Sequence, residues 1–395
     1  MESTPFQFGQ LAAGQGFVNR TADLAHLHKT LSQGVNTILI APRRWGKTSL
    51  VHHLSRQYSN EKLVFCHIDL YSVRDEKAFF ELLGKTVINA THNKLESALD
   101  SLRQWLSNIS PKISLGQYPD QELGIEFDFS SDKIDPSALL NLPEKIAQAK
   151  NIRLVLCFDE FQNIEYLTDS LPFQKLLRSH WQQHQHVTYL LYGSKRHMLM
   201  QLFEKQSYPF YKFGQVVYLD KIPAAEFEHY ICTQFAHHNK KITKKQAKAV
   251  VQLMDNKPYH VQQLAFILFN QTQTQVDAEA LNRSLQSLLT QGLALYQHLF
   301  ESLSNMQVNL MNALVKNDPR SLYSHEFIKD YRLKSSANVT RSLQGLEDKE
   351  IIDRFDGNID INDPGFRIWW RQCLLGRKAL DQVVFEQALR QSQPE

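Results

Sequence analysis

Residues 41–48 constrain the fold of this chain more than any other segment. They read Ala-Pro-Arg-Arg-Trp-Gly-Lys-Thr, they follow a short apolar run at residues 36–40, and a helical pattern continues to residue 57. A buried strand that turns tightly into a helix points several backbone N–H groups at one spot, at the positive end of the helix. The segment therefore predicts a phosphate-binding loop after a strand of a sheet.

Three residues of this loop have separate expected roles. Gly46 permits a close approach of phosphate to the backbone, Lys47 reaches the β- and γ-phosphates, and the Thr48 hydroxyl binds Mg²⁺. The pattern G-x-x-x-x-G-K-T is met except at its first position, where the Cβ of Ala41 narrows the available backbone angles. Gly-Lys-Thr also occurs by chance at ordinary helix starts, but the preceding strand favours the phosphate loop. We expect nucleotide binding to survive Ala41, and its effect on turnover stays open.

Two acids follow a second apolar run, at residues 154–158. Asp159 is expected to hold Mg²⁺ through its water shell, and Glu160 to polarise the attacking water as a general base. Such a run ending in Asp-Glu is common by itself, but together with the loop it predicts a site for Mg-ATP. A third run, residues 187–192, precedes Ser194, which we expect beside the γ-phosphate unless it is simply a turn serine.

Cations near these motifs are candidates to stabilise the charge that develops during phosphoryl transfer. The sequence does not choose among them, and each one alone also suits a solvated or structural role. They are Arg43, Arg44, Arg196 and Lys212.

Apolar runs alternate with helical patterns through the first half of the chain, which predicts an α/β fold with a parallel sheet of about five strands. We expect this core to span residues 1–220, with a hairpin inserted at 109–135 around a Tyr-Pro-Asp turn. Residues 221–291 are helical in pattern and predict a lid, in which Pro258 opens a helix. Residues 292–376 predict a winged helix, and 377–395 a C-terminal helix or tail whose last five residues are disordered.

Composition narrows the class further. A formal net charge of +3 lacks the strong positive field typical of nucleic-acid binding, although a local basic face stays open. No stretch approaches the roughly 18 apolar residues that span a bilayer, so we expect a cytoplasmic protein without a membrane partner. The four cysteines are scattered and are expected to be reduced and structural, and the histidine pairs 52–53 and 237–238 to lie on the surface.

These motifs resemble those of the archaeal-type ATPase family, within the STAND and AAA+-like P-loop NTPases. Residues 17–20, Phe-Val-Asn-Arg, are similar to the family's adenine-facing N-terminal motif, and residues 159–162, Asp-Glu-Phe-Gln, to its acidic motif. Residues 256–259, Asn-Lys-Pro-Tyr, resemble its lid motif without the usual glycine, and residues 361–369 its Asp-Pro and aromatic ending. The resemblance implies nucleotide contacts by Phe17, Arg20, Pro42, Arg43, Arg44, Trp45, Gly46, Lys47, Thr48, Ser49, Asp159 and Pro258.

The resemblance also implies an ATPase that acts as a switch, in which ATP closes the lid on the core and hydrolysis releases it. The partner is then an unidentified protein, and homo-oligomers stay open. One alternative is an ATP-regulated DNA-binding protein that reads DNA with residues 336–348, although Lys334 and Arg341 alone are few cations for that task. A second alternative is a low-turnover nucleotide-binding scaffold in a defence or regulatory assembly, against which Glu160 argues.

Overall fold

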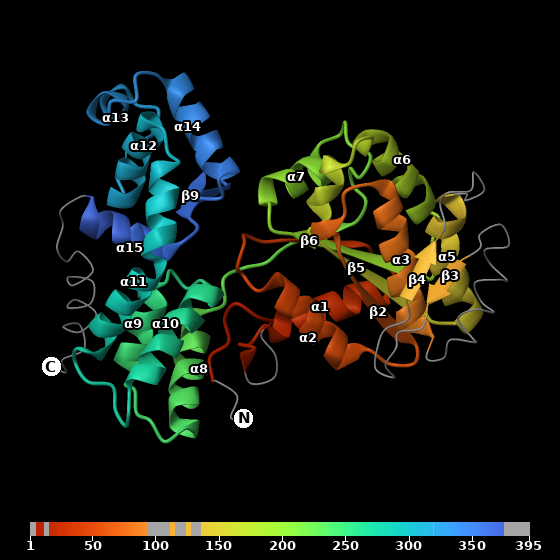
Figure 1. Cartoon of the computed structure of the whole chain (residues 1–395), viewed down its shortest axis with the longest axis horizontal. Coiled ribbons are helices and arrows are strands. Elements are labelled where there is room, and N and C mark those ends of the chain that lie inside the picture. Colours follow the sequence, from red (N-terminus) through yellow and green to blue (C-terminus); the bar gives the residue numbers. More distant parts are fainter. Residues whose placement is uncertain are drawn as a thin grey trace. The chain divides into compact units, whose positions relative to one another are not determined.

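The computed structural model describes residues 5–11, 16–92, 111–114, 124–127, 136–318 and 320–374. The chain divides into two compact units. One, here called the core unit, is made of residues 20–43 and 47–220. The other, the helical unit, is made of residues 1–19, 44–46 and 221–395, so it includes three residues of the phosphate loop. Figure 1 labels most of the elements of both units.

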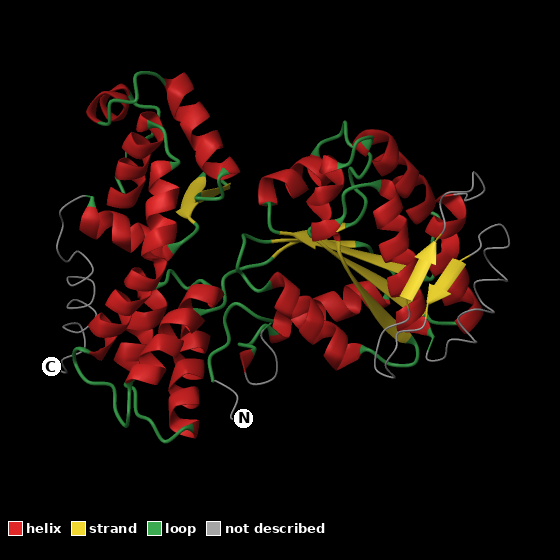
Figure 2. Ribbon diagram, in the orientation of Figure 1, coloured by secondary structure: helices red, strands yellow, loops and turns green. Residues whose placement is uncertain are grey.

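The core unit contains a five-stranded sheet in the order β2-β5-β6-β1-β7, and all neighbouring strands are parallel. The predicted α/β fold with a parallel sheet is therefore confirmed. The strands, drawn in yellow in Figure 2, are β1 (Thr37–Ile40), β2 (Leu63–Asp69), β5 (Arg153–Asp159), β6 (Val187–Gly193) and β7 (Gln215–Tyr218). Because β6 lies between β1 and β5, the carboxyl ends of these three strands meet at one edge of the sheet.

Both faces of the sheet are covered, which explains why its strands are continuous apolar runs rather than alternating ones. Ile38 and Ile40 of β1 point to one face and share a buried cluster with residues of α3, α5, α6 and α7. Helices α1 and α2 lie on the opposite face (Figure 1). The helices of the core unit are α1 (Thr21–Ser32), α2 (Lys47–Tyr58), α3 (Glu76–Thr91), α5 (Pro136–Lys150), α6 (Ser170–Trp181) and α7 (Arg196–Glu204), with 3₁₀ turns η2 (Leu70–Ser72) and η3 (Phe161–Tyr166).

Within the segment predicted as a hairpin, β3 (Pro111–Ser114) and β4 (Gly124–Phe127) pair antiparallel, and Ile113 lies opposite Ile125. The Tyr-Pro-Asp turn between them, at residues 118–120, lies outside the described residues.

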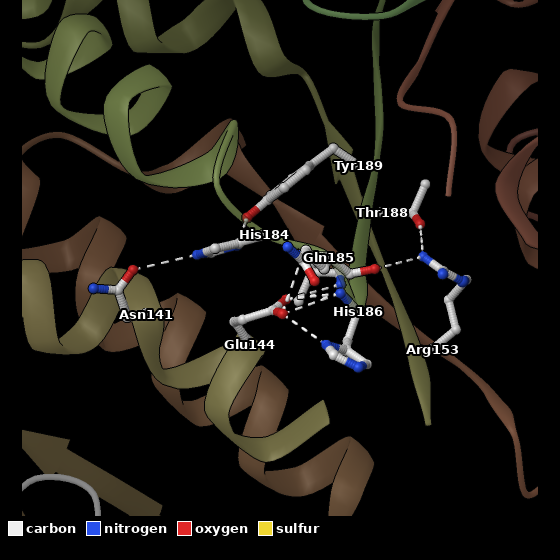
Figure 3. Close-up of polar contacts among 9 residues, drawn as sticks. Asn141, Glu144, Arg153, His184, Gln185, His186, Thr188 and Tyr189 are labelled. Carbon is white, nitrogen blue, oxygen red and sulfur yellow. Dashed lines mark hydrogen bonds and ion pairs between the residues drawn. The ribbon is translucent and has the colours of Figure 1, made fainter. Parts of the chain in front are cut away.

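The carboxylate of Glu144 is hydrogen-bonded to the backbone at the amino end of β6 (Figure 3). Glu144 of α5 accepts hydrogen bonds from the backbone N–H groups of Gln185, His186 and Val187 at 3.0–3.1 Å, and its Oε1 lies 2.8 Å from His186 Nδ1. Burial alone would raise the pKa of Glu144, but these hydrogen bonds outweigh it and hold the pKa below its ordinary value. The ionised carboxylate therefore stabilises this end of the sheet.

The helical unit begins with four helices and continues with a winged helix. Its elements are α8 (Ala224–His237), α9 (Lys244–Leu253), α10 (Pro258–Gln271), α11 (Ala280–Glu301), α12 (Asn305–Lys316), α13 (His325–Asp330), α14 (Ser336–Asp348), β8 (Ile352–Phe355), β9 (Asn358–Ile361) and α15 (Pro364–Cys373). Strands β8 and β9 pair antiparallel around the Asp-Gly turn at 356–357, where both residues have positive φ. The predicted winged helix is confirmed.

Helix α11 joins the lid helices to the winged helix without a break, since its 22 residues include positions 291 and 292, where we expected a domain boundary. One buried apolar cluster runs from Phe227 of α8 to Trp370 of α15. Polar contacts add to it: Lys257 lies 3.0 Å from Asp360 of β9, and Arg367 of α15 lies 3.0 Å from Asp255. Lid and winged helix therefore form one packed body.

Several other expectations concern single residues. All four cysteines are free, with Cys66 and Cys157 buried and Cys373 exposed. His52 is half-buried and stacks on His67 with ring centroids 4.0 Å apart, so the expectation that it lies on the surface is wrong. None of the helices in the described ranges has the length and apolarity to cross a membrane. Residues 377–395 lie outside the described part of the chain.

Candidate nucleotide site

The loop between β1 and α2 has the backbone shape that its sequence predicts. Two of its residues adopt left-handed conformations, Arg44 with φ 65° and Gly46 with φ 84°. A Cβ added at Gly46 would meet nothing within 4 Å, so this glycine borders open space and is required for its backbone angle rather than for close packing. The space beside Gly46 fits the approach of a phosphate group to the backbone.

Ala41 occupies the position of the first loop glycine without strain. It is fully buried and is absent from the residues with positive φ, so an L-residue adopts its conformation freely. The Cβ of Ala41 narrows the available backbone angles, as expected, but it does not strain the loop. The Ala41 carbonyl instead accepts a hydrogen bond of 2.8 Å from Lys47 Nζ.

Lys47 is the first residue of α2, and its side chain is buried although it carries a charge. Its Nζ donates to the carbonyl oxygens of Ala41 and Pro42, at 2.8 and 2.9 Å. These neutral acceptors replace water around the ammonium group but do not neutralise its charge. The ammonium group is thus held within the loop, where an anionic phosphate is a better partner than a carbonyl.

Thr48 and Asp159 meet across two elements that are 111 residues apart in sequence. The Thr48 hydroxyl donates a 2.6 Å hydrogen bond to Asp159 Oδ2, while Asp159 Oδ1 accepts from the backbone N–H of Glu160 at 2.8 Å. Burial raises the pKa of Asp159 to about 6. This carboxylate is therefore held in the fold at a cost, which a bound cation would remove.

Glu160 follows the carboxyl end of β5 with φ 50°, and the left-handed backbone turns its side chain toward β6. Its Oε2 accepts from the Ser194 hydroxyl at 2.9 Å, from the Ser194 N–H at 3.2 Å, and from Gln162 Nε2. Three donors thus converge on one carboxylate oxygen and fix the orientation of the group. The structure brings Glu160 and Ser194 together as members of one hydrogen-bonded cluster.

Gln162, which the sequence singled out only as the last residue of the acidic motif, also belongs to this cluster. It is 1% exposed, and its Oε1 has no hydrogen-bond partner among the described residues. A Cβ at Gly193 would overlap that oxygen, so glycine at the end of β6 makes room for the amide. Its place three residues after Asp159 was visible in the sequence, but a polar residue in a turn gives no signal that it is buried.

The other predicted contacts in the core unit have varied surroundings. Arg20 is buried and its Nη1 donates to the Asp220 carbonyl at 2.8 Å, beside Asp23 at 3.1 Å, so it fastens the end of the core unit. Pro42 is buried, Arg43 is exposed and Ser49 lies in the first turn of α2. Arg196 begins α7 and is buried, whereas Lys212 has φ 53° and its Nζ lies 5.3 Å from the Tyr211 ring centroid.

The remaining predicted contacts belong to the helical unit. Pro258 is the first residue of α10, Phe17 is half-buried, and Trp45 is buried with Lys221 Nζ 5.9 Å from its ring centroid. The family resemblance implies a glycine near Asn256 or Lys257, and in this segment Asp255 and Asn256 have φ 50° and 58°. They therefore adopt the left-handed turn that glycine would otherwise supply.

The arrangement in the core unit fits Mg²⁺ and a nucleoside triphosphate. The Thr48 hydroxyl and the Asp159 carboxylate are oxygen ligands of the kind that Mg²⁺ prefers. The ammonium group of Lys47, at the start of α2, is a suitable partner for the phosphates. Among the described residues, no group of three or more His, Cys, Asp or Glu side chains is arranged to hold a metal ion by itself.

A parallel sheet with a phosphate loop after its fourth strand in spatial order, followed by a C-terminal winged helix, defines the fold of a P-loop NTPase with a winged-helix domain. A family profile described as a probable winged helix domain matches residues 294–372.

Solved structures agree with this assignment of the fold. The chain is similar to the Walker-type ATPase PABY2304 of Pyrococcus abyssi, with 16% identity, 91% of this chain and 97% of the other covered, and a TM-score of 0.64. It is also similar to the ORC2 protein of Aeropyrum pernix in its ADPNP–ADP complexes, with 12% identity, coverage of 98% and 99%, and a TM-score of 0.54. No curated protein matches the chain. The resemblance to archaeal-type ATPases with a winged helix is confirmed at the level of the fold.

Proposed function

We propose that the chain is an ATP-binding and ATP-hydrolysing switch of the AAA+/STAND type, which couples Mg-ATP binding and hydrolysis to movement of the lid and winged helix. The observation that carries this proposal is that three polar groupings lie at the carboxyl ends of β1, β5 and β6. They are Lys47 on the loop carbonyls, the Thr48–Asp159 pair and the Glu160–Ser194 pair. In open parallel sheets, ligands bind at that edge.

Each of these residues has a role that its surroundings support. Lys47 exchanges its two carbonyl acceptors for phosphate oxygens, and Thr48 and Asp159 hold Mg²⁺, which supplies charge neutralisation when it is bound. Glu160 keeps Oε1 to accept a proton from water while Oε2 is held by Ser194 and Gln162. A general base oriented in this way argues against a scaffold that does not turn over ATP.

Two variants test the proposal on the purified full chain. With Lys47→Ala we expect Mg-ATP to stop raising the melting temperature, and with Glu160→Gln we expect that stabilisation to remain while phosphate release falls by about 100-fold or more. If wild-type protein shows no ATP-dependent thermal shift, or if Lys47→Ala hydrolyses ATP at the wild-type rate, the proposal is wrong.

DNA binding through the winged helix remains the second candidate because exposed cations surround the turn between α13 and α14. They are Lys329, Arg332, Lys334 and Arg341. Arg354 of the wing, in contrast, is paired with the buried carboxylate of Glu347. A gel shift with duplex DNA at low salt tests this reading: a salt-dependent shift that Arg341→Ala together with Lys334→Ala weakens would support it, and no shift at low salt would refute it.

A further inference from the structure

One residue of the phosphate loop makes its side-chain contacts within the helical unit. Arg44 Nη1 lies 3.6 Å from Asp363 Oδ2, and the guanidinium carbon lies 4.7 Å from the centroid of the Tyr259 ring. Tyr259 is in the first turn of α10, directly after Pro258, and Asp363 caps α15. Two motifs that the sequence singled out, the lid motif and the Asp-Pro motif, thus meet on one loop arginine.

The contact is electrostatically specific. Asp363 Oδ1 accepts from the Phe366 N–H at 3.1 Å and lies 3.9 Å from His260 Nδ1, so Oδ2 is the oxygen that faces Arg44. Burial lowers the pKa of His260, so this histidine is neutral near pH 7 and does not compete with Arg44 as a cation. Arg44 is therefore the cation that the Asp363 carboxylate takes in this cluster at neutral pH.

The backbone of Arg44 shows why the contact bears on nucleotide binding. Arg44 is left-handed at φ 65°, two residues before Gly46, in the turn that would surround a phosphate. A phosphate group carries more charge than a carboxylate and accepts guanidinium hydrogen bonds in the same geometry. A phosphate group bound at this turn would therefore compete with Asp363 for the Arg44 side chain.

We propose that Asp363 is a positioning residue that holds Arg44 in the nucleotide-free protein, and that phosphate groups of bound ATP take Arg44 from it. This inference rests on the proposed ATP site and adds its regulation. Asp363 is the N-cap of α15 in the winged helix, and Tyr259 belongs to α10 of the lid. The exchange of partners by Arg44 thus links phosphate binding to the body formed by lid and winged helix. Arg44 contributes to ATP affinity, and Asp363 opposes that contribution.

The test is the affinity of the full chain for Mg-ATP, measured by titration calorimetry. Asp363→Asn keeps the ability to cap α15 but removes the charge, and we expect it to bind ATP about fivefold more tightly, the scale of one partly exposed ion pair. Arg44→Ala should weaken binding, and Asp363→Asn added to Arg44→Ala should change affinity by less than about twofold.

Asp277→Asn is the matched control, because Asp277 also accepts from backbone N–H groups at a helix start and pairs with an arginine, Arg283, at 2.7 Å. It should leave ATP affinity unchanged. If a thermal melt shows that Asp363→Asn is poorly folded, Asp363→Ser replaces it, because serine is also a good N-cap residue. This variant should show the same gain in ATP affinity.

The inference is overturned if neither Asp363 variant tightens binding, or if the gain persists in the Arg44→Ala background. Wild-type protein that binds no ATP would instead refute the proposed function itself, and the inference with it. If wild-type protein binds ATP and the Asp363 variants bind it with equal affinity, the proposed ATP site stands and only the role of Asp363 is refuted.

Discussion

The two ends of strands β5 and β6 carry carboxylates in opposite energetic situations. At the amino end, Glu144 accepts three backbone N–H groups and contacts His186, and its pKa lies below the ordinary value (Figure 3). At the carboxyl end, Asp159 accepts one hydroxyl and one N–H, and burial raises its pKa to about 6. The hydrogen bonds of the first carboxylate outweigh its burial, whereas those of the second do not.

From this difference we infer that the amino end of the sheet serves stability and that the carboxyl end is the candidate ligand site. Buried charges that destabilise the folded state are typical of functional sites, where a bound ligand interacts with the charge. The same contrast holds for Gln162, whose buried Oε1 lacks a partner in the described chain beside the carboxyl end. Substitutions at the two ends should therefore have opposite consequences for stability and activity.

The largest effect is expected at Glu160. Glu160→Gln removes the proton acceptor but keeps the shape, so ATP turnover should fall by about 100- to 1,000-fold while the free energy of unfolding changes by less than about 1 kcal/mol. Steady-state phosphate release and urea unfolding measure the two quantities. Turnover within about threefold of wild type would mean that Glu160 is not the base.

Glu144→Gln should show the reverse pattern. A neutral amide oxygen accepts fewer and weaker hydrogen bonds than the carboxylate does, so we expect a loss of about 2 kcal/mol in the free energy of unfolding. ATP turnover of the folded protein at 20 °C should stay within about twofold of wild type. Urea unfolding checks the first value, and a variant as stable as wild type would contradict the account of this end.

A smaller effect is expected from pH through His184, which lies beside Glu144 in Figure 3. Its Nδ1 contacts Tyr189 Oη at 2.7 Å and its Nε2 contacts Asn141 Oδ1 at 3.3 Å, which the neutral ring satisfies. Burial lowers the pKa of His184 to about 4 from an unfolded value near 6.5, so the unfolded chain binds more protons between these values.

Stability should therefore be full above pH 6.5 and fall as the pH drops toward 4, with His184 responsible for about 1 kcal/mol between pH 7 and 5.5. His184→Gln should reduce that slope in urea unfolding followed across this range, and His180→Gln serves as the control. An unchanged slope in His184→Gln would show that the ring is already charged or exposed in the folded protein.

The sequence predicted the sheet and the winged helix because strand-length apolar runs, the Pro at 258 and the Asp-Gly turn at 356–357 act locally. It also indicated the elements that carry Thr48, Asp159 and Ser194, because the carboxyl ends of parallel strands meet. It did not predict the burial of Gln162 or the Arg44–Asp363 pair, since these depend on contacts between residues far apart in sequence or hidden in turns. Ala41 fits the phosphate loop without strain because its φ is not positive, and the residue type alone does not reveal that angle.

The most direct test of the Mg-ATP site is the melting temperature of Asp159→Asn, measured without ligand and with Mg-ATP. Asn can still accept the Glu160 N–H and contact Thr48, and it removes a buried charge, so the ligand-free variant should be more stable by about 1 kcal/mol. Mg-ATP should stabilise it much less than wild type. A variant that is less stable without ligand and keeps the wild-type Mg-ATP shift would contradict the account.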